Sequence, residues 1–213
     1  MHSPTLPLPR APLADEVRRG AVAFALALGV FVALGVAAAW TGVFARLPAP
    51  VIPAFVLSFT VALCVWYRRS RSLRAFAWSV PLRVLVLFHG VRAFIGADFL
   101  RLLGEGRLPE SFAYHAGIGD IVSGVLALVV LLPLRGDARR RVLWGWNALA
   151  LLDIATVMVT AQVSVLGGDP LLRAAFAQPP YGAIPFLLVL VFTTHIFIFV
   201  RLRHERASEG RSA

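Results

Sequence analysis

The sequence predicts an all-α membrane protein with six transmembrane helices and with both the N and C termini in the cytoplasm. Hydrophobic residues make up 59% of the 213 residues and charged residues only 15%, whereas a typical soluble domain has about 45–50% and about 25%. The apolar residues gather in long runs. The basic residues, all 21 of them arginine, lie mostly between these runs.

Six apolar runs account for most of the chain, and stretches rich in proline, glycine and arginine separate them. A spanning helix needs about 20 apolar residues, with a range of about 17–25. Because lipid offers no hydrogen-bond partners to the backbone, each run should be helical. The alternating segments of about 10 residues that form a transmembrane β-barrel are absent from the sequence. The runs cover residues 21–43, 51–67, 81–103, 112–133, 142–166 and 183–200.

Each run can be justified in turn. The first is longer than the ~7–15 apolar residues of a signal peptide, so we expect it to be retained. The second lies near the lower length limit, and the remaining four are long enough to span. The predicted organisation is therefore a Pro-rich cytoplasmic lead (1–19), a six-helix transmembrane domain (20–203) and a basic cytoplasmic tail (204–213).

The distribution of arginine predicts the orientation. With alternating connections, sixteen arginines fall on one side and three on the other, while Arg92 and Arg101 lie within the third run. Cytoplasmic loops carry the excess of basic residues, so both termini are expected in the cytoplasm and the protein in the plasma (inner) membrane. The sixteen are Arg10, Arg18, Arg19, Arg68, Arg69, Arg71, Arg74, Arg83, Arg135, Arg139, Arg140, Arg141, Arg201, Arg203, Arg206 and Arg211; the three are Arg46, Arg107 and Arg173.

The same distribution bears on partners. A net charge of +10 could indicate nucleic-acid binding, but that function needs the basic residues on one face of a soluble domain. We therefore predict the lipid bilayer as the partner and no nucleic acid. Assembly into a homo-oligomer or a larger membrane complex is a further possibility that the sequence leaves undecided. No metal-binding, phosphate-binding or nucleophile motif is visible, so no metal site is predicted, no catalytic residue can be assigned and no enzyme class is indicated.

Three charged residues lie deep in the third, fourth and fifth runs. Arg92 and Asp153 each lie eleven residues from the cytoplasmic start of their run, about 16 Å at ~1.5 Å per residue, and Asp120 comes to about 18 Å in a ~30 Å core. A charge at this depth costs at least ~2.5–3.5 kcal/mol unless it faces protein or water. The three should therefore meet near the midplane, with Arg92 as the anion anchor and Asp120 and Asp153 as its partners or as proton carriers.

Helical periodicity places these charges on polar or small-residue stripes that should face inward. Two interpretations remain open: a network that only fixes helix packing, and a site that binds or transfers a small polar or protonatable species. Asp98 and Arg101, three residues apart, read as a local pair near the membrane surface. One stripe comprises Ala116, Gly117, Asp120, Gly124 and Ala127; another comprises Asp153, Thr156, Thr160 and Ser164.

Two histidines suggest an alternative from another class of protein. His89 and His195 lie at matching depths, ~9–12 Å from the cytoplasmic edge, on different runs. Two such histidines could ligate a b-type haem axially and make an electron-transfer module. Only Gly90 adjoins His89 as a small neighbour, so no cofactor is expected and haem b is kept as the alternative.

Residues in the third to sixth apolar runs resemble an uncharacterised family of bacterial six-helix integral membrane proteins. The resemblance covers about two-thirds of the chain, and the Gly119-Asp120 segment is its most specific part. It implies the same fold and membrane location and draws attention to Arg92, Asp120 and Asp153, without implying an activity. It rests on Arg92-x-x-x-Gly96, Leu108-Pro109-x-x-Phe112-Ala113-x-x-Ala116-Gly117-x-Gly119-Asp120, Leu152-Asp153 and the stretch from Pro185 to His195.

Overall fold

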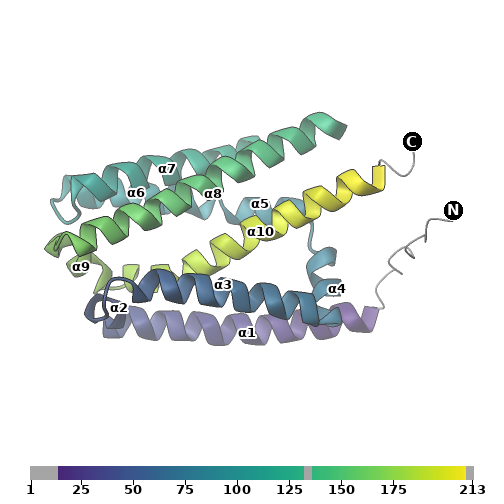
Figure 1. Cartoon of the computed structure of the whole chain (residues 1–213), viewed down its shortest axis with the longest axis horizontal. Helices are drawn as coiled ribbons and strands as arrows, with labels where there is room; N and C mark the ends of the chain where they lie inside the picture. Colours follow the sequence, from purple (N-terminus) through teal and green to yellow (C-terminus); the bar gives the residue numbers. More distant parts are fainter. Residues whose placement is uncertain (1–13, 132–135, 210–213) are drawn as a thin grey trace, which may run out of the picture.

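The computed structural model describes residues 14–131 and 136–209, and these form helices and short connections with no strand among them. The predicted all-helical fold is confirmed. In chain order the α-helices are α1 (Ala14–Thr41), α2 (Val43–Arg46), α3 (Val51–Arg69), α4 (Arg71–Ser79), α5 (Leu82–Phe88), α6 (Val91–Gly104), α7 (Glu110–Val129), α8 (Gly136–Leu166), α9 (Pro170–Phe176) and α10 (Ile184–Glu209), with a 3₁₀ helix, η1 (Tyr181–Ala183), before α10 (Figure 1).

Within residues 14–131 and 136–209, five helices are long and apolar enough to cross a membrane: α1, α3, α7, α8 and α10 with η1. A sixth span is reached if α4 and the segment Leu82–Gly104, which are bent by 84° at a short break, count as one. The predicted runs thus correspond to five or six candidate spans.

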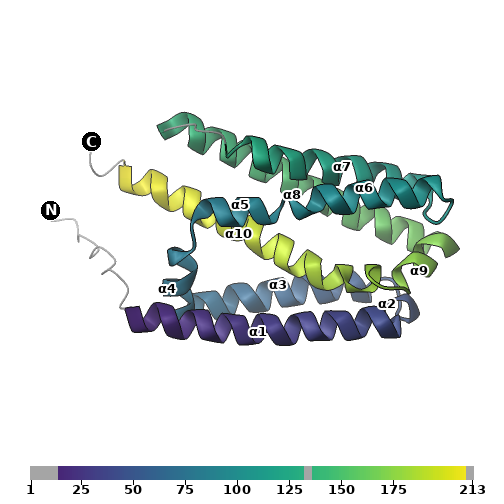
Figure 2. The same cartoon turned by 180° about the vertical axis from the view of Figure 1, so that it is seen from behind.

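The long helices form two groups with α10 between them. In Figures 1 and 2, α1 and α3 run along one side and α6, α7 and α8 along the other, while α10 crosses obliquely between the groups. Contacts between α6 and α7, between α7 and α8, and between α10 and both α3 and α8 hold this arrangement. The helix α4 lies across one end, where it packs against α1.

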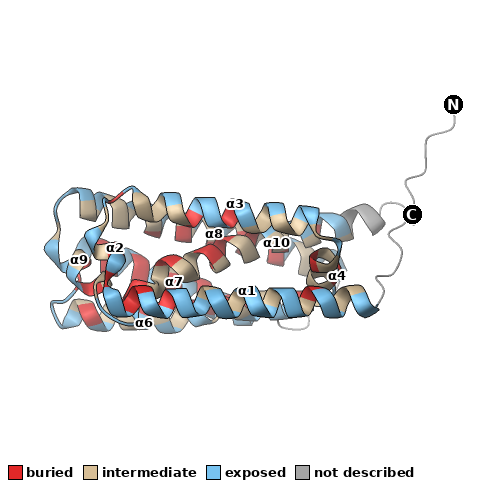
Figure 3. Cartoon of the chain, turned by 90° about the horizontal axis from the view of Figure 1, so that it is seen from below, coloured by how far each residue is buried: buried red, intermediate tan, exposed pale blue. Residues whose placement is uncertain are grey.

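The outer surface carries many exposed apolar side chains, which is compatible with a surface that faces lipid. Trp40 is 76% exposed and Phe94 is 80% exposed, and exposed residues dominate the outward faces of α1 and α3 in Figure 3. Soluble monomers rarely expose such a large contiguous apolar surface. The buried residues instead concentrate between the helices.

Three boundaries differ from the predicted ones. The helix α1 begins at Ala14, so the last six residues of the predicted lead are helical, while the rest of the lead lies outside the described residues. The predicted tail begins inside α10, which ends at Glu209. The connection after α3 contains α4, because the Ser70 hydroxyl accepts a hydrogen bond from the Leu73 backbone N–H (3.1 Å) and caps a new helix.

The third predicted run is interrupted at His89 and Gly90, between α5 and α6. Here the backbone hydrogen bonds span three residues, as in Arg92 N–H to the His89 carbonyl (3.1 Å) and Ala93 N–H to the Gly90 carbonyl (3.1 Å). A 3₁₀ segment inside a helix often marks a functional or strained position. The break places His89 at the end of α5 and Arg92 in the first turn of α6.

Candidate functional site

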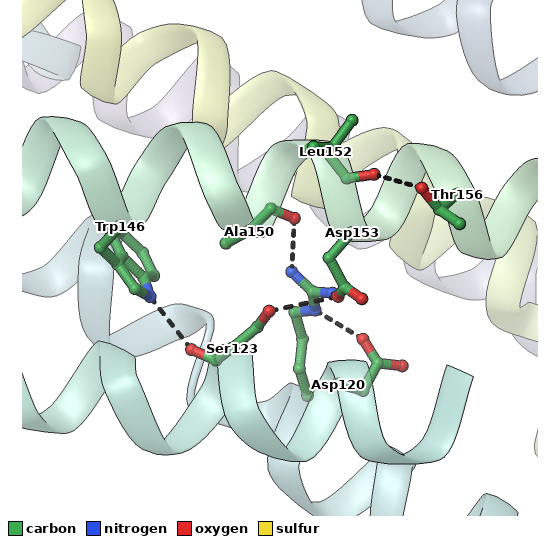
Figure 4. A network of polar contacts seen from close by, with 8 residues as sticks. Asp120, Ser123, Trp146, Ala150, Leu152, Asp153 and Thr156 are labelled. Atoms are coloured by element: carbon green, nitrogen blue, oxygen red, sulfur yellow. Dashed lines mark hydrogen bonds and ion pairs between the residues drawn. The ribbon is translucent and has the colours of Figure 1, made fainter. Parts of the chain in front are cut away.

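Arg92 holds three helices together. Its residue is 2% exposed, and its guanidinium donates from Nε to an Asp120 carboxylate oxygen (2.7 Å), from Nη1 to the Ala150 carbonyl (3.0 Å) and from Nη2 to the Asp153 carboxylate. Figure 4 shows Asp120 on one helix facing Asp153 and Ala150 on the other. The planar guanidinium suits this task because its donors point along fixed directions to several acceptors.

Small residues let α6 and α7 approach closely enough to bury this contact. A Cβ atom added to Gly96 would lie 2.4 Å from the Gly117 carbonyl oxygen, and one added to Gly124 would lie 2.5 Å from the Ala93 nitrogen. Both neighbours are backbone atoms and cannot rotate away. Close backbone approach through small residues is how helices associate in membranes, so these glycines position Arg92 against Asp120.

Asp153 lies against the surface of α7. A Cβ atom added to Gly119 would be 1.9 Å from Asp153 Oδ1, so only glycine leaves room for this carboxylate. The Ser123 hydroxyl donates to Asp153 Oδ2 (3.2 Å), and Trp146 Nε1 donates to the Ser123 carbonyl (3.1 Å). The side chain of Asp153 is 22% exposed, against 5% for Asp120. It is therefore the more accessible carboxylate.

A cavity of about 90 Å³ reaches Arg92 and Asp120. Its walls come from α2, α3, α6, α7, α8, α9 and α10 and are mainly apolar, with Gln162 and Arg173 as further polar members. The volume is large enough for several water molecules, because one water needs about 10–15 Å³. Arg173 lies on α9 and Arg92 near the centre of the helices, so the cavity connects one end of the molecule with the charged cluster.

Of the two residue stripes expected to face inward around this cluster, one does so throughout and the other does not. The small-residue stripe of α7 is buried throughout, as predicted. The stripe on α8 is not, because Thr156 is exposed and bonds only to the Leu152 carbonyl (3.0 Å). Beyond Asp153, that stripe therefore does not continue the inward polar face.

The expected pair of Asp98 and Arg101 at the end of α6 is present, and it belongs to a cluster with more members than predicted. Arg101 Nε donates to Asp98 (2.8 Å), and Asp98 also accepts a hydrogen bond from the Tyr181 hydroxyl of η1. Just beyond the helix, hydrogen bonds from Arg107 and Arg101 hold the pKa of the Glu105 carboxyl below its usual value. These groups form a separate surface cluster.

His89 and His195 also meet. Both are fully buried, and their ring centroids are 4.0 Å apart with an angle of 33° between the planes. Thr194 Oγ1 donates to carbonyls of its own helix, so it accepts from His89 Nε2 (3.1 Å). Asn147 Nδ2 donates to the His195 carbonyl (3.0 Å), which leaves its Oδ1 to accept from His195 Nδ1 (2.8 Å). These bonds indicate a proton on His89 Nε2 and on His195 Nδ1.

This packing does not fit a haem held between the two histidines. Atoms in contact lie about 3.5–4.0 Å apart, so two rings with centroids at 4.0 Å already touch and leave no layer for a porphyrin. The remaining nitrogens, His89 Nδ1 and His195 Nε2, are buried without a hydrogen-bond partner in the described residues.

The absorption spectrum of the purified protein checks this conclusion. We expect no Soret band in protein prepared from haem-replete cells, with or without dithionite, because the stacked rings fill the space between their helices. An intense band that disappears in both His89→Ala and His195→Ala would contradict the packing and restore the electron-transfer alternative.

Comparison with known proteins places this site within a family. A family model described as a domain of unknown function (DUF8737) matches residues 49–203, well over half of the chain. The chain belongs to this family. No curated protein and no solved structure matches it.

The DUF8737 match includes the whole charged cluster and the histidine pair, and it begins after α1 and α2. The description gives no activity, membrane location or source. The resemblance to bacterial six-helix proteins therefore stays a prediction, as do the roles of Arg92, Asp120 and Asp153.

The sequence alone did not lead us to predict that neutral polar residues form hydrogen bonds with the charged cluster and the histidine pair. Asn147 is fully buried, and Ser123, Trp146 and Thr194 complete the hydrogen bonds of the charged and histidine pairs. Two signals were present. Ser123 follows Asp120 at helical spacing, and Asn147 is an amide inside an otherwise apolar run, where a polar group needs a partner.

Proposed function

We propose that this chain is a six-span protein of the plasma (inner) membrane, with both termini in the cytoplasm, whose Arg92, Asp120 and Asp153 bind and transfer a small polar or protonatable species. The observation that carries the proposal is the charge balance of the buried cluster. One guanidinium contacts two carboxylates from different helices. Arginine stays charged in proteins, so the cluster with both carboxylates ionised has one excess negative charge.

An excess negative charge in a low-dielectric interior favours the uptake of a proton or a small cation. The cavity that reaches Arg92 and Asp120 supplies an approach from one end of the molecule. Asp153 is the more accessible carboxylate. The proton is the species that this arrangement favours most, because it is the smallest and adds the one charge needed.

The arginine distribution supports the proposed orientation. Basic residues cluster at the start of α1, around the α3–α4 connection, at the start of α8 and late in α10, and these segments share one end of the molecule in Figure 1. The three arginines of the other set lie on α2, after α6 and on α9, at the opposite end. The positive-inside rule then assigns the richer end to the cytoplasm.

A reporter fusion tests the orientation. A fluorescent protein that matures only in the cytoplasm should be bright when fused after Ala213, and alkaline phosphatase at the same position should be inactive. Active phosphatase there would overturn either the number of spans or the assignment of the arginine-rich end.

Proton flux through reconstituted vesicles tests the site. Vesicles with the wild-type protein, driven by a potassium diffusion potential and read with an internal pH dye, should take up protons faster than protein-free vesicles. Asp153→Asn should abolish the difference, because asparagine keeps the shape and some hydrogen bonds but carries no proton. Arg101→Gln, at the surface cluster, should transport like wild type.

The flux of the variants distinguishes a role of the charged cluster in proton transfer from a role in helix packing alone. Each variant is first shown to be folded by gel filtration and circular dichroism. Flux equal to that of protein-free vesicles, or a folded Asp120→Asn/Asp153→Asn double variant with full flux, would contradict proton transfer and leave the cluster a packing role.

A further inference from the structure

A second, larger cavity lies away from the charged cluster. It measures about 410 Å³ and is enclosed by α1, α3, α4, α5 and α10. In Figure 3, α1 and α3 flank the region and α4 crosses one end of it. Phenylalanine and leucine side chains form most of its lining, among them Phe24, Leu28, Leu63 and Phe88.

The few polar side chains of this lining are already satisfied by the protein. The Tyr67 hydroxyl accepts from Trp78 Nε1 (3.0 Å), and the hydroxyls of Thr193 and Thr194 donate to the carbonyls of Val189 (2.7 Å) and Leu190 (2.8 Å). The walls therefore offer an occupant mainly apolar contact. In a bilayer, a lipid acyl chain is the apolar group at hand.

Unpaired positive charge surrounds one end of this cavity. Arg68, Arg69 and Arg71 lie on the connection between two lining residues, Tyr67 and Leu73. All three are exposed, and within the described part of the chain none forms an ion pair with a carboxylate. Their charge is available to a phosphate group.

Arg201 adds a guanidinium that is fixed in place beside the same end. Its Nη1 donates to the carbonyls of Ala77 (3.1 Å), Trp78 (3.2 Å) and Val80 (3.0 Å) at the end of α4, and its guanidinium carbon lies 4.8 Å from the centre of a Trp78 ring. Ala77 and Val80 line the cavity. The Arg201 Nε is buried and donates to no acceptor in the described residues, so one donor of this cation is unused.

We propose that this cavity binds one acyl chain of an anionic phospholipid, whose phosphate is held by arginines of the α3–α4 connection and by Arg201. Apolar walls select the chain, and the unpaired guanidinium groups select a negatively charged headgroup, because arginine matches phosphate oxygens with paired donors. The site is separate from the Arg92 cluster, so tests of lipid binding do not depend on whether the protein transfers protons.

Lipid titration of the full-length protein in detergent tests the headgroup part. Phosphatidylglycerol should bind, as counted by native mass spectrometry, more tightly than phosphatidylcholine of the same chain length. Arg69→Gln/Arg71→Gln should weaken the binding of phosphatidylglycerol by about 25-fold, since each arginine near an anionic headgroup contributes a factor of about five. The control Arg141→Gln/Arg203→Gln removes two exposed arginines from the same end of the molecule and should change binding little.

A pair of tryptophan variants on one helix tests the chain part. Leu28 lines the cavity, whereas Leu26 is 68% exposed on the same helix. Leu28→Trp should fill the space and remove the bound lipid, and Leu26→Trp should retain it. The proposal would be overturned if phosphatidylglycerol and phosphatidylcholine bound equally well, or if both double arginine variants lost the same amount of lipid binding. It would also be overturned if both tryptophan variants retained the lipid equally, or if inorganic phosphate displaced it.

Discussion

Arg92→Ala is expected to be the most destabilising substitution in this protein. It removes the partner of two carboxylates and one carbonyl at once. Breaking a buried ion pair by removing one member costs about 3–5 kcal/mol, because the remaining charge is left in a low dielectric. The Tm of the detergent-purified protein should therefore fall markedly.

Two comparisons make this result specific. Arg101→Ala should lower the Tm little, because its side chain is 52% exposed and its pairs are screened by solvent. The triple variant Arg92→Leu/Asp120→Asn/Asp153→Asn should recover much of the loss, since it removes all the buried charges together. If Arg92→Ala and Arg101→Ala had the same effect, Arg92 would not be buried among its partners.

Gly96→Ala should have the second largest effect, although it adds one methyl group. The added Cβ would lie 2.4 Å from the Gly117 carbonyl oxygen and 2.9 Å from the Ile121 nitrogen, so α6 and α7 would have to separate. Overpacking of this kind costs about 1–3 kcal/mol and occasionally more. The separation would also lengthen the contact between Arg92 and Asp120.

The control for this variant lies on the same helix. Gly104→Ala adds the same group where no atom lies within 4 Å, and alanine favours a helix over glycine by about 0.8–1.0 kcal/mol. Its Tm should equal or exceed that of the wild type. A Gly96→Ala protein as stable as Gly104→Ala would show that α6 and α7 do not touch at this level.

The sequence was sufficient for the all-helical fold class because each apolar run is at least as long as the lower limit for a spanning helix, and such a run is expected to be helical. The sequence also predicted that Arg92 contacts Asp120 and Asp153, because charges buried at the same depth are costly unless they pair. The rest depends on contacts between distant segments. The carbonyl of Ala150 gives no sign in the sequence that a guanidinium will reach it. The stacking of His89 on His195 depends on how α10 crosses α5.

The helical break and the short helices were also beyond sequence reasoning. His89 and Gly90 lie in a run that is apolar on both sides, and hydropathy averages over such a break. The same averaging assigned α4 to a connection, because its arginines lower the hydropathy of a segment that Ser70 nevertheless caps as a helix.

If the chain spans a membrane as we propose, the contacts of Arg92 also affect the order in which its helices insert. During synthesis Asp120 appears 28 residues after Arg92, and Asp153 appears 61 residues after it. Until then α6 carries a bare guanidinium, which lipid alone accommodates at a cost of about 2.5–3.5 kcal/mol or more. It follows that α6 does not settle into lipid by itself. We therefore expect α6 to insert as a hairpin with α7, whose Asp120 balances the guanidinium charge, and α8 to join afterwards, when Asp153 supplies the second carboxylate.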